Sequence, residues 1–138
     1  MEKFLALAVA LLLLVPAAAS ADQFPSLRRL QDFLLKYSPN QIDSTGPHYA
    51  ELEGVVLDVR WTGASNHWEI TLQVDQPDAI KPLGSETGLV TVHFRLHQEE
   101  PPVAVGDEIT VFGEVNSLYS SVMIPYIQAR TINGSEDF

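Results

Sequence analysis

The 138-residue chain contains no cysteine. This absence excludes disulfide bonds, thiol catalysis and thiolate metal sites, and it removes the lipid-bearing cysteine of a lipoprotein. Basic residues are scarce as well: 8 lysines and arginines stand against 18 aspartates and glutamates, which gives a net charge of −10. A field of this sign repels phosphate backbones and anionic lipid headgroups, although its commonest use is solubility.

The chain also lacks an apolar run of the roughly 20 residues that a membrane span requires. Its longest run, Phe4 to Val15, is followed by Pro16 and the small residues AAASA. This combination is typical of a signal peptide, and the best cleavage site follows Ala21. We therefore expect a periplasmic or secreted mature chain without integral membrane association, of a size usual for one domain. An exported chain without disulfides fits a bacterial periplasm best.

Two stretches precede the main body of the mature chain. Residues 24–38 have apolar positions at helical spacing, with Ser26 as the expected N-cap. They predict one amphipathic helix. Residues 38–50 contain two prolines and a glycine without any period, and they predict a linker.

From residue 51 the apolar period changes to two, which predicts five strands and no crossover helix. Gly113 lies on an inward face, where a missing side chain allows the sharp bend that barrel strands need. We expect an all-β, five-stranded Greek-key barrel over 51–132, preceded by the helix and followed by a polar tail at 133–138. The predicted inward residues are Val55, Leu57, Val59 and Trp61; Trp68, Ile70, Leu72 and Val74; Val90, Val92, Phe94 and Leu96; and Ile109, Val111 and Val115.

Three sequence features match a known superfamily: a first strand that begins Gly54-Val55-Val56, the stretch VGDEITVFGEV, and the closing strand IPYIQARTI. Their order resembles the OB-fold. Within it, the chain resembles small exported bacterial OB-fold (BOF) proteins, which are linked to envelope stress and ligand binding. It resembles Slp-type outer-membrane lipoproteins more weakly, because the lipid-attachment cysteine is absent. The helix usual before the fourth strand has no room in HQEEPPVAVGD, so the helix at 26–37 is the expected plug of the barrel.

The outer face of the second and third strands is where OB-folds usually hold single-stranded nucleic acids. Here it offers one arginine, no aromatic hydrocarbon ring and a glutamate, which disfavours that function. His93 and His97 are about 13 Å apart, too far for one metal ion, and a metal site would need His67. We expect no metal and no cofactor. The residues on this outer face of the second and third strands are His67, Glu69, Thr71, Gln73, Thr91, His93, Arg95 and His97.

Trp61 and Trp68 flank the loop TGASN, and they either close one end of the core or form a binding platform. Catalytic signals are missing: there is no nucleophile elbow, no phosphate-binding glycine loop and no helical histidine pair. We predict a non-catalytic module that binds an envelope protein or a glycan. The alternatives are a single-stranded nucleic-acid binder and an assembly protein that uses the N-terminal helix. The candidate binding residues are Arg60, Trp61, Asn66, His67, Trp68, His93, Arg95, Tyr119 and Tyr126.

Overall fold

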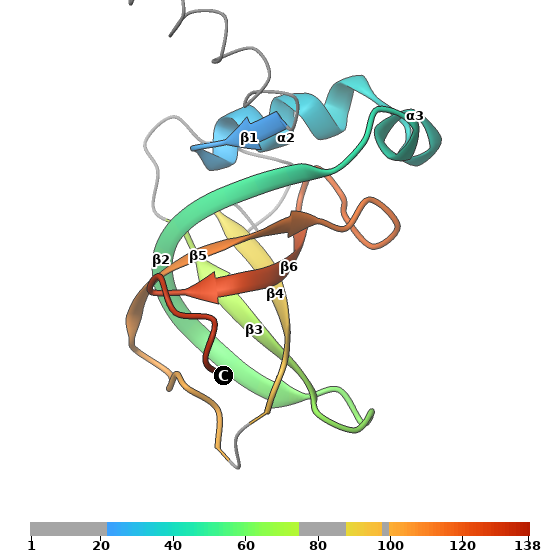
Figure 1. The fold of residues 1–138 in the computed structure, drawn as a ribbon. Helices are drawn as coiled ribbons and strands as arrows, with labels where there is room; N and C mark the ends of the chain where they lie inside the picture. The colour runs from blue at the N-terminus through green and yellow to red at the C-terminus, as the bar shows by residue number, and fades with distance from the viewer. Residues whose placement is uncertain (1–21, 75–87, 98–99) are drawn as a thin grey trace, which may run out of the picture.

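A computed structural model of the protein describes residues 22–74, 88–97 and 100–138. The predicted signal peptide and most of the loop between the second and third predicted strands lie outside these residues. The described elements are β1 (Asp22–Phe24), α2 (Leu27–Lys36), α3 (Pro39–Ser44), β2 (His48–Trp61), β3 (His67–Gln73), β4 (Leu89–Arg95), β5 (Glu108–Val115) and β6 (Tyr126–Ile132) (Figure 1).

Strands β2 to β6 close into a barrel. β2, β3 and β4 form an antiparallel meander, β4 pairs with β6 in parallel, and β6 pairs antiparallel with β5. The first half of β2 closes the ring by pairing antiparallel with β5, from Tyr49 opposite Glu114 to Val55 opposite Glu108. β1 adds a short parallel strand beside β2. This order is that of a five-stranded OB barrel, so the predicted fold class is confirmed.

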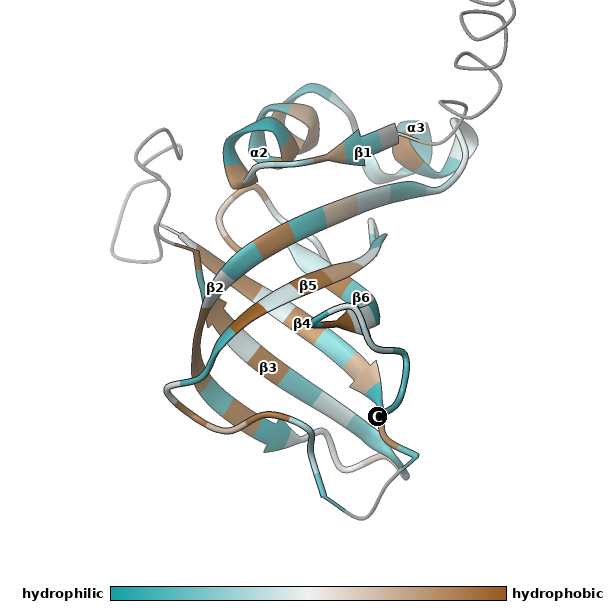
Figure 2. Cartoon of the chain, turned by 60° about the vertical axis from the view of Figure 1, so that its left-hand side comes forward, coloured by the Kyte–Doolittle hydropathy of each residue, from teal (hydrophilic) through white to brown (hydrophobic). Residues whose placement is uncertain are grey.

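The inward faces of the strands build the core, as the alternation along β3 in Figure 2 illustrates. Trp68 is half-buried and packs against this core. For β3, β4 and β5 the predicted faces are correct. The buried residues of these strands and their ends are Ile70, Leu72, Val74, Val90, Val92, Phe94, Leu96, Ile109, Val111 and Val115.

The predicted inward face of the first strand is wrong over its first half. Val56, predicted outward, is fully buried, whereas Leu57, predicted inward, is 47% exposed. Val55, also predicted inward, is only half-buried. The register of β2 against β3 shifts directly after Val56, which marks a β-bulge. Because one extra residue reverses the alternation, Val59 returns to the core side as predicted.

The segment predicted as a linker, residues 38–50, contains secondary structure. α3 begins at Pro39, where a missing N–H costs nothing, and Gln41 Oε1 accepts a hydrogen bond from the Ser38 N–H at 2.9 Å. β2 begins at His48, before the predicted barrel boundary at 51. Ile42 is the buried apolar residue of α3, and one such residue gives no readable period.

The C-terminal residues 133–138, predicted as a polar tail, end in a core contact. Phe138 is buried, and its ring forms a T-shaped pair with the Phe94 ring at a centroid distance of 5.9 Å. The backbone N–H of His97 donates to the Phe138 carbonyl at 2.9 Å. The last residue therefore packs on the barrel.

Helix α2 confirms the predicted helix, and the Ser26 hydroxyl accepts a hydrogen bond from the Arg29 N–H at 3.3 Å. Leu27 and Leu30 are fully buried and belong to the barrel's core cluster. α2 lies across one end of the barrel, in the place of a plug (Figure 1). None of the described helices is long and apolar enough to cross a membrane.

Candidate ligand-binding groove

The outer side of β3, β4 and β6 bears a hollow of about 340 Å³. Residues 116–125, here called the β5–β6 loop, contribute to one of its walls. The alternation that buries Ile70 and Val92 turns their neighbours outward into this hollow. We call it the β3–β4–β6 groove. It is lined by Thr62, His67, Glu69, His93, Asn116, Tyr119, Tyr126 and Gln128.

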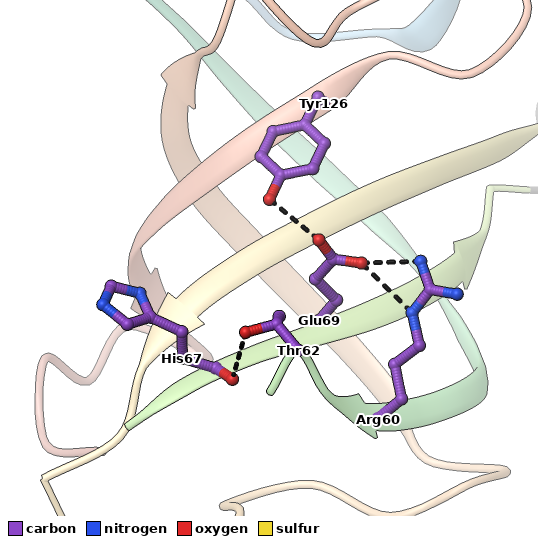
Figure 3. Close-up of polar contacts among 5 residues, drawn as sticks. All are labelled: Arg60, Thr62, His67, Glu69 and Tyr126. Carbon is purple, nitrogen blue, oxygen red and sulfur yellow. Dashed lines mark hydrogen bonds and ion pairs between the residues drawn. The ribbon is translucent and has the colours of Figure 1, made fainter. Parts of the chain in front are cut away.

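Glu69 links three strands through its carboxylate (Figure 3). One oxygen, Oε2, accepts hydrogen bonds from Arg60 Nη2 at 2.6 Å and Arg60 Nε at 3.1 Å, and the other accepts from the Tyr126 hydroxyl at 3.0 Å. Burial and the bond to Glu69 raise the pKa of Tyr126 well above its usual range, and the same carboxylate raises the pKa of Arg60. The charge of Arg60 is thereby paired, whereas Arg95, opposite His67, is exposed.

His67 and His93 form a hydrogen-bonded imidazole pair. Nδ1 of His67 lies 2.9 Å from Nε2 of His93. The ring centroids are 5.0 Å apart and the planes differ by 22°, so the rings meet through their edges in nearly one plane. Burial, followed by the charge of His67, lowers the pKa of His93. The pair therefore favours the neutral state of His93.

Rings continue from this pair across the groove. The His93 and Tyr126 centroids are 6.1 Å apart with planes 23° apart, and the Tyr126 and Tyr119 centroids are 5.4 Å apart. We call Tyr119, Tyr126, His93 and His67 the ring row. Tyr119 at its end is 65% exposed, which offers an accessible aromatic face to a ligand.

Helices α2 and α3 anchor the β5–β6 loop that carries Tyr119. Gln31, fully buried on α2, donates from Nε2 to the Val122 carbonyl at 3.1 Å. The Ser117 hydroxyl donates to a carboxylate oxygen of Asp43 on α3. Each of these contacts joins an N-terminal helix to the β5–β6 loop. Together they hold one wall of the groove in place.

The groove brings together four of the predicted binding residues, namely His67, His93, Tyr119 and Tyr126, and Arg60 joins them through Glu69. Their predicted role in binding stays a prediction. The alternation of inward and outward residues predicts that the two histidines share one face. Tyr119 lies on a loop, and only the folded structure shows that it is close to them.

The other predicted binding residues lie outside the groove lining. Trp61, predicted to face inward, is instead 57% exposed at the end of β2, and its indole N–H donates to the Ala64 carbonyl at 2.8 Å. Trp68 packs on the core. Asn66 adopts a left-handed turn conformation with φ of 63°, and its carbonyl accepts from Leu96. Arg95 is exposed on β4 opposite His67.

Glu69, Thr62, Asn116 and Gln128 line the groove but are absent from the predicted site. Glu69 shares a strand face with His67, and that spacing is the signal that could have included it. Gln128 lies opposite His93 in the parallel pairing of β4 with β6, which only the barrel topology reveals. Among the described residues, no group of three or more histidines and carboxylates could hold a metal ion.

No protein-family model and no curated protein matches the chain. Solved structures match it in fold. One is a lipoprotein from Klebsiella pneumoniae, provisionally described as nucleic acid-binding; it is 23% identical, with 82% of this chain and 92% of that chain covered and a TM-score of 0.51. Another is yeast Stn1 and Ten1, 12% identical, with 81% of this chain and 61% of that chain covered and a TM-score of 0.49.

At such identities a likeness concerns the fold and not the ligand. The finer resemblance to BOF or Slp proteins stays a prediction. The barrel's strand order is that of the OB-fold, and the Klebsiella protein is similar to this chain in fold.

Proposed function

We propose that the protein is a non-catalytic OB-fold module that binds a neutral glycan of the bacterial envelope in the β3–β4–β6 groove. The observation that carries the proposal is the composition of this groove: aromatic rings stand beside side chains that both donate and accept hydrogen bonds, and the described residues that line it include no lysine or arginine. OB-folds use this part of the barrel for oligosaccharides as well as oligonucleotides.

A sugar ring presents apolar C–H faces and hydroxyl edges. Tyr119 supplies an exposed aromatic face, and the amides of Asn116 and Gln128 each carry both donors and an acceptor. Hydroxyl groups need this dual capacity because each both donates and accepts. The groove therefore matches the polarity of a glycan without requiring charge.

A single-stranded nucleic acid would stack on the same rings, but its affinity comes largely from cationic contacts to phosphate. Beside the groove, Arg60 is paired with Glu69 at 2.6 Å and Arg95 is exposed, while the chain as a whole carries a net charge of −10. These charges favour a neutral ligand over a polyanion.

The lack of catalysis and the envelope location are parts of the same proposal. The groove carboxylate, Glu69, accepts three hydrogen bonds from Arg60 and Tyr126, so it is engaged in holding strands together. The location is supported by the apolar run and small residues that precede Asp22. Protein exported by a bacterial host is expected to start at Asp22 by mass spectrometry; an intact Met1 would contradict export.

Binding is tested by calorimetry on the exported protein with three probes: an N-acetylglucosamine tetramer, a neutral glucose tetramer and an oligothymidylate. We expect binding to the glycan probes and none to the oligonucleotide at low salt. Tyr119→Ala should weaken glycan binding by about tenfold, or about 1.4 kcal/mol, whereas its exposed loop neighbour Leu118→Ala should not. Oligonucleotide binding that falls with salt, or no binding of either glycan probe, would contradict the proposal.

A further inference from the structure

The contact between His67 and His93 constrains how many protons the pair can hold. Nδ1 of one ring and Nε2 of the other are 2.9 Å apart, and the rings are nearly coplanar. Such a bond needs one N–H and one lone pair. The neutral pair satisfies this need, and so does the pair with one added proton on an outer nitrogen. When both rings are protonated, two N–H groups face each other and the bond cannot exist.

The surroundings offer little to hold a second proton. Glu69 is opposite His93 in register and its charge acts to raise the pKa of His93, but its carboxylate already accepts bonds from Arg60 and Tyr126, and the burial of His93 outweighs it. Arg95 is opposite His67 and adds positive charge on the same face. Burial and the neighbouring imidazole lower the pKa of His93. The titratable and charged groups around the pair are Glu69 on β3, Arg95 on β4, Arg60 on β2, Tyr126 on β6 and Tyr119 on the β5–β6 loop.

We propose that the imidazole pair of His67 and His93 is an acid-sensitive latch of the β3–β4–β6 groove, which holds the ring row together when at most one ring is protonated and separates when both are. This inference rests on the proposed function, because the latch regulates the same site. Its physical basis is the position of His93, which contacts His67 on one side and lies 6.1 Å from the Tyr126 ring on the other.

The sign of the pH effect follows from the lowered pKa of His93. A histidine whose pKa is lower in the folded state than its usual value of about 6.5 stabilises the closed arrangement above that pH. This stabilisation is lost as the pH falls through the lowered value. The His67–His93 bond is therefore intact at neutral pH and breaks in acid.

The latch is tested first without ligand, by NMR titration of histidine side chains in the whole exported protein. In the wild type, His93 should protonate below about pH 6.5, and the ring signals of Tyr126 should shift in the same step. Removal of the partner in His67→Ala should raise the His93 midpoint, with His67→Asn as a second variant if the first misfolds. His97→Ala, an exposed histidine outside the pair, is the matched control and should leave the midpoint unchanged.

The latch would be overturned if the midpoint pH of His93 were unchanged in both His67 variants. It would also be overturned if the Tyr126 ring signals did not shift during the histidine titration. A second arm measures affinity for the N-acetylglucosamine tetramer. It should fall about tenfold between about pH 7.5 and pH 4.5 in the wild type and much less in His67→Ala. Equal losses in both proteins would also overturn the latch. A tetramer that fails to bind at any pH contradicts the proposed function, and the ligand-free titration still decides the latch.

Discussion

At the scale of single residues, the bond between Tyr126 and Glu69 ties β6 to β3 beside the groove. The phenol donates to the carboxylate at 3.0 Å, which it can do only while protonated. Burial and this bond raise the pKa of Tyr126, so the folded state binds this proton more tightly than the unfolded chain does. The stabilisation is complete below the unfolded tyrosine pKa of about 10 and is lost as the pH rises further.

We predict that the free energy of unfolding falls above about pH 10 in the wild type, and that Tyr126→Phe reduces the slope. At neutral pH the same substitution should cost about 1 kcal/mol, because one hydrogen bond to a charged group at a half-exposed site is lost. Urea unfolding between neutral and alkaline pH measures both values. A variant with the wild-type slope would show that Tyr126 does not hold its proton in this way.

Gly113 is required by a close approach of two backbones. The register of β5 against β6 shifts between Phe112 and Gly113, and a Cβ on Gly113 would overlap the backbone carbonyl of Gln128. We predict that Gly113→Ala destabilises the protein by about 1–3 kcal/mol because backbone atoms have to move. Glu114→Ala, which loses a surface ion pair with Arg130, should cost less than about 1 kcal/mol by the same urea assay. Equal effects would contradict the steric account.

At the scale of elements, strand faces could be predicted wherever the alternation is unbroken. For β3 it gives the core residues and, by exclusion, the outward His67 and Glu69. β2 differs because this long strand serves two neighbours, β5 along its first half and β3 along its second. The bulge after Val56 lies where the pairing partner of β2 changes from β5 to β3. The prediction assumed that inward and outward residues alternate without interruption, so it could not include the extra residue of a bulge.

Helix α2 stabilises the barrel through one face. Leu30 is fully buried in the shared core, whereas Leu35 on the same helix is 61% exposed. We predict that Leu30→Ala lowers the free energy of unfolding by about 2–5 kcal/mol, the cost of a large-to-small change in a packed core. Leu35→Ala should change it by less than about 0.5 kcal/mol. Thermal and urea unfolding measure both, and a mild effect of Leu30→Ala would mean that the helix is not part of the core.

At the scale of the whole molecule, the sequence predicts the five barrel strands and the barrel class but not the short strand β1, and its candidate binding residues include half of those that line the groove. His67 and His93 are close because adjacent strands bring them together, which alternation predicts. Tyr119 and Gln128 reach the groove through the return of β6 beside β4, a parallel pairing between segments far apart in the chain. Local patterns contain no information about such a pairing, and only the OB resemblance implies it.

The central claim is that the β3–β4–β6 groove is where this OB barrel binds its ligand. The most direct measurement is a map of NMR amide shifts on addition of the N-acetylglucosamine tetramer at neutral pH. We predict that the largest shifts fall on His93, Asn116, Tyr119 and Gln128, with none at Leu57 and Val105, exposed residues outside the groove lining. Amide shifts centred on Leu57 and Val105, with no shifts on the residues that line the groove, would contradict the account.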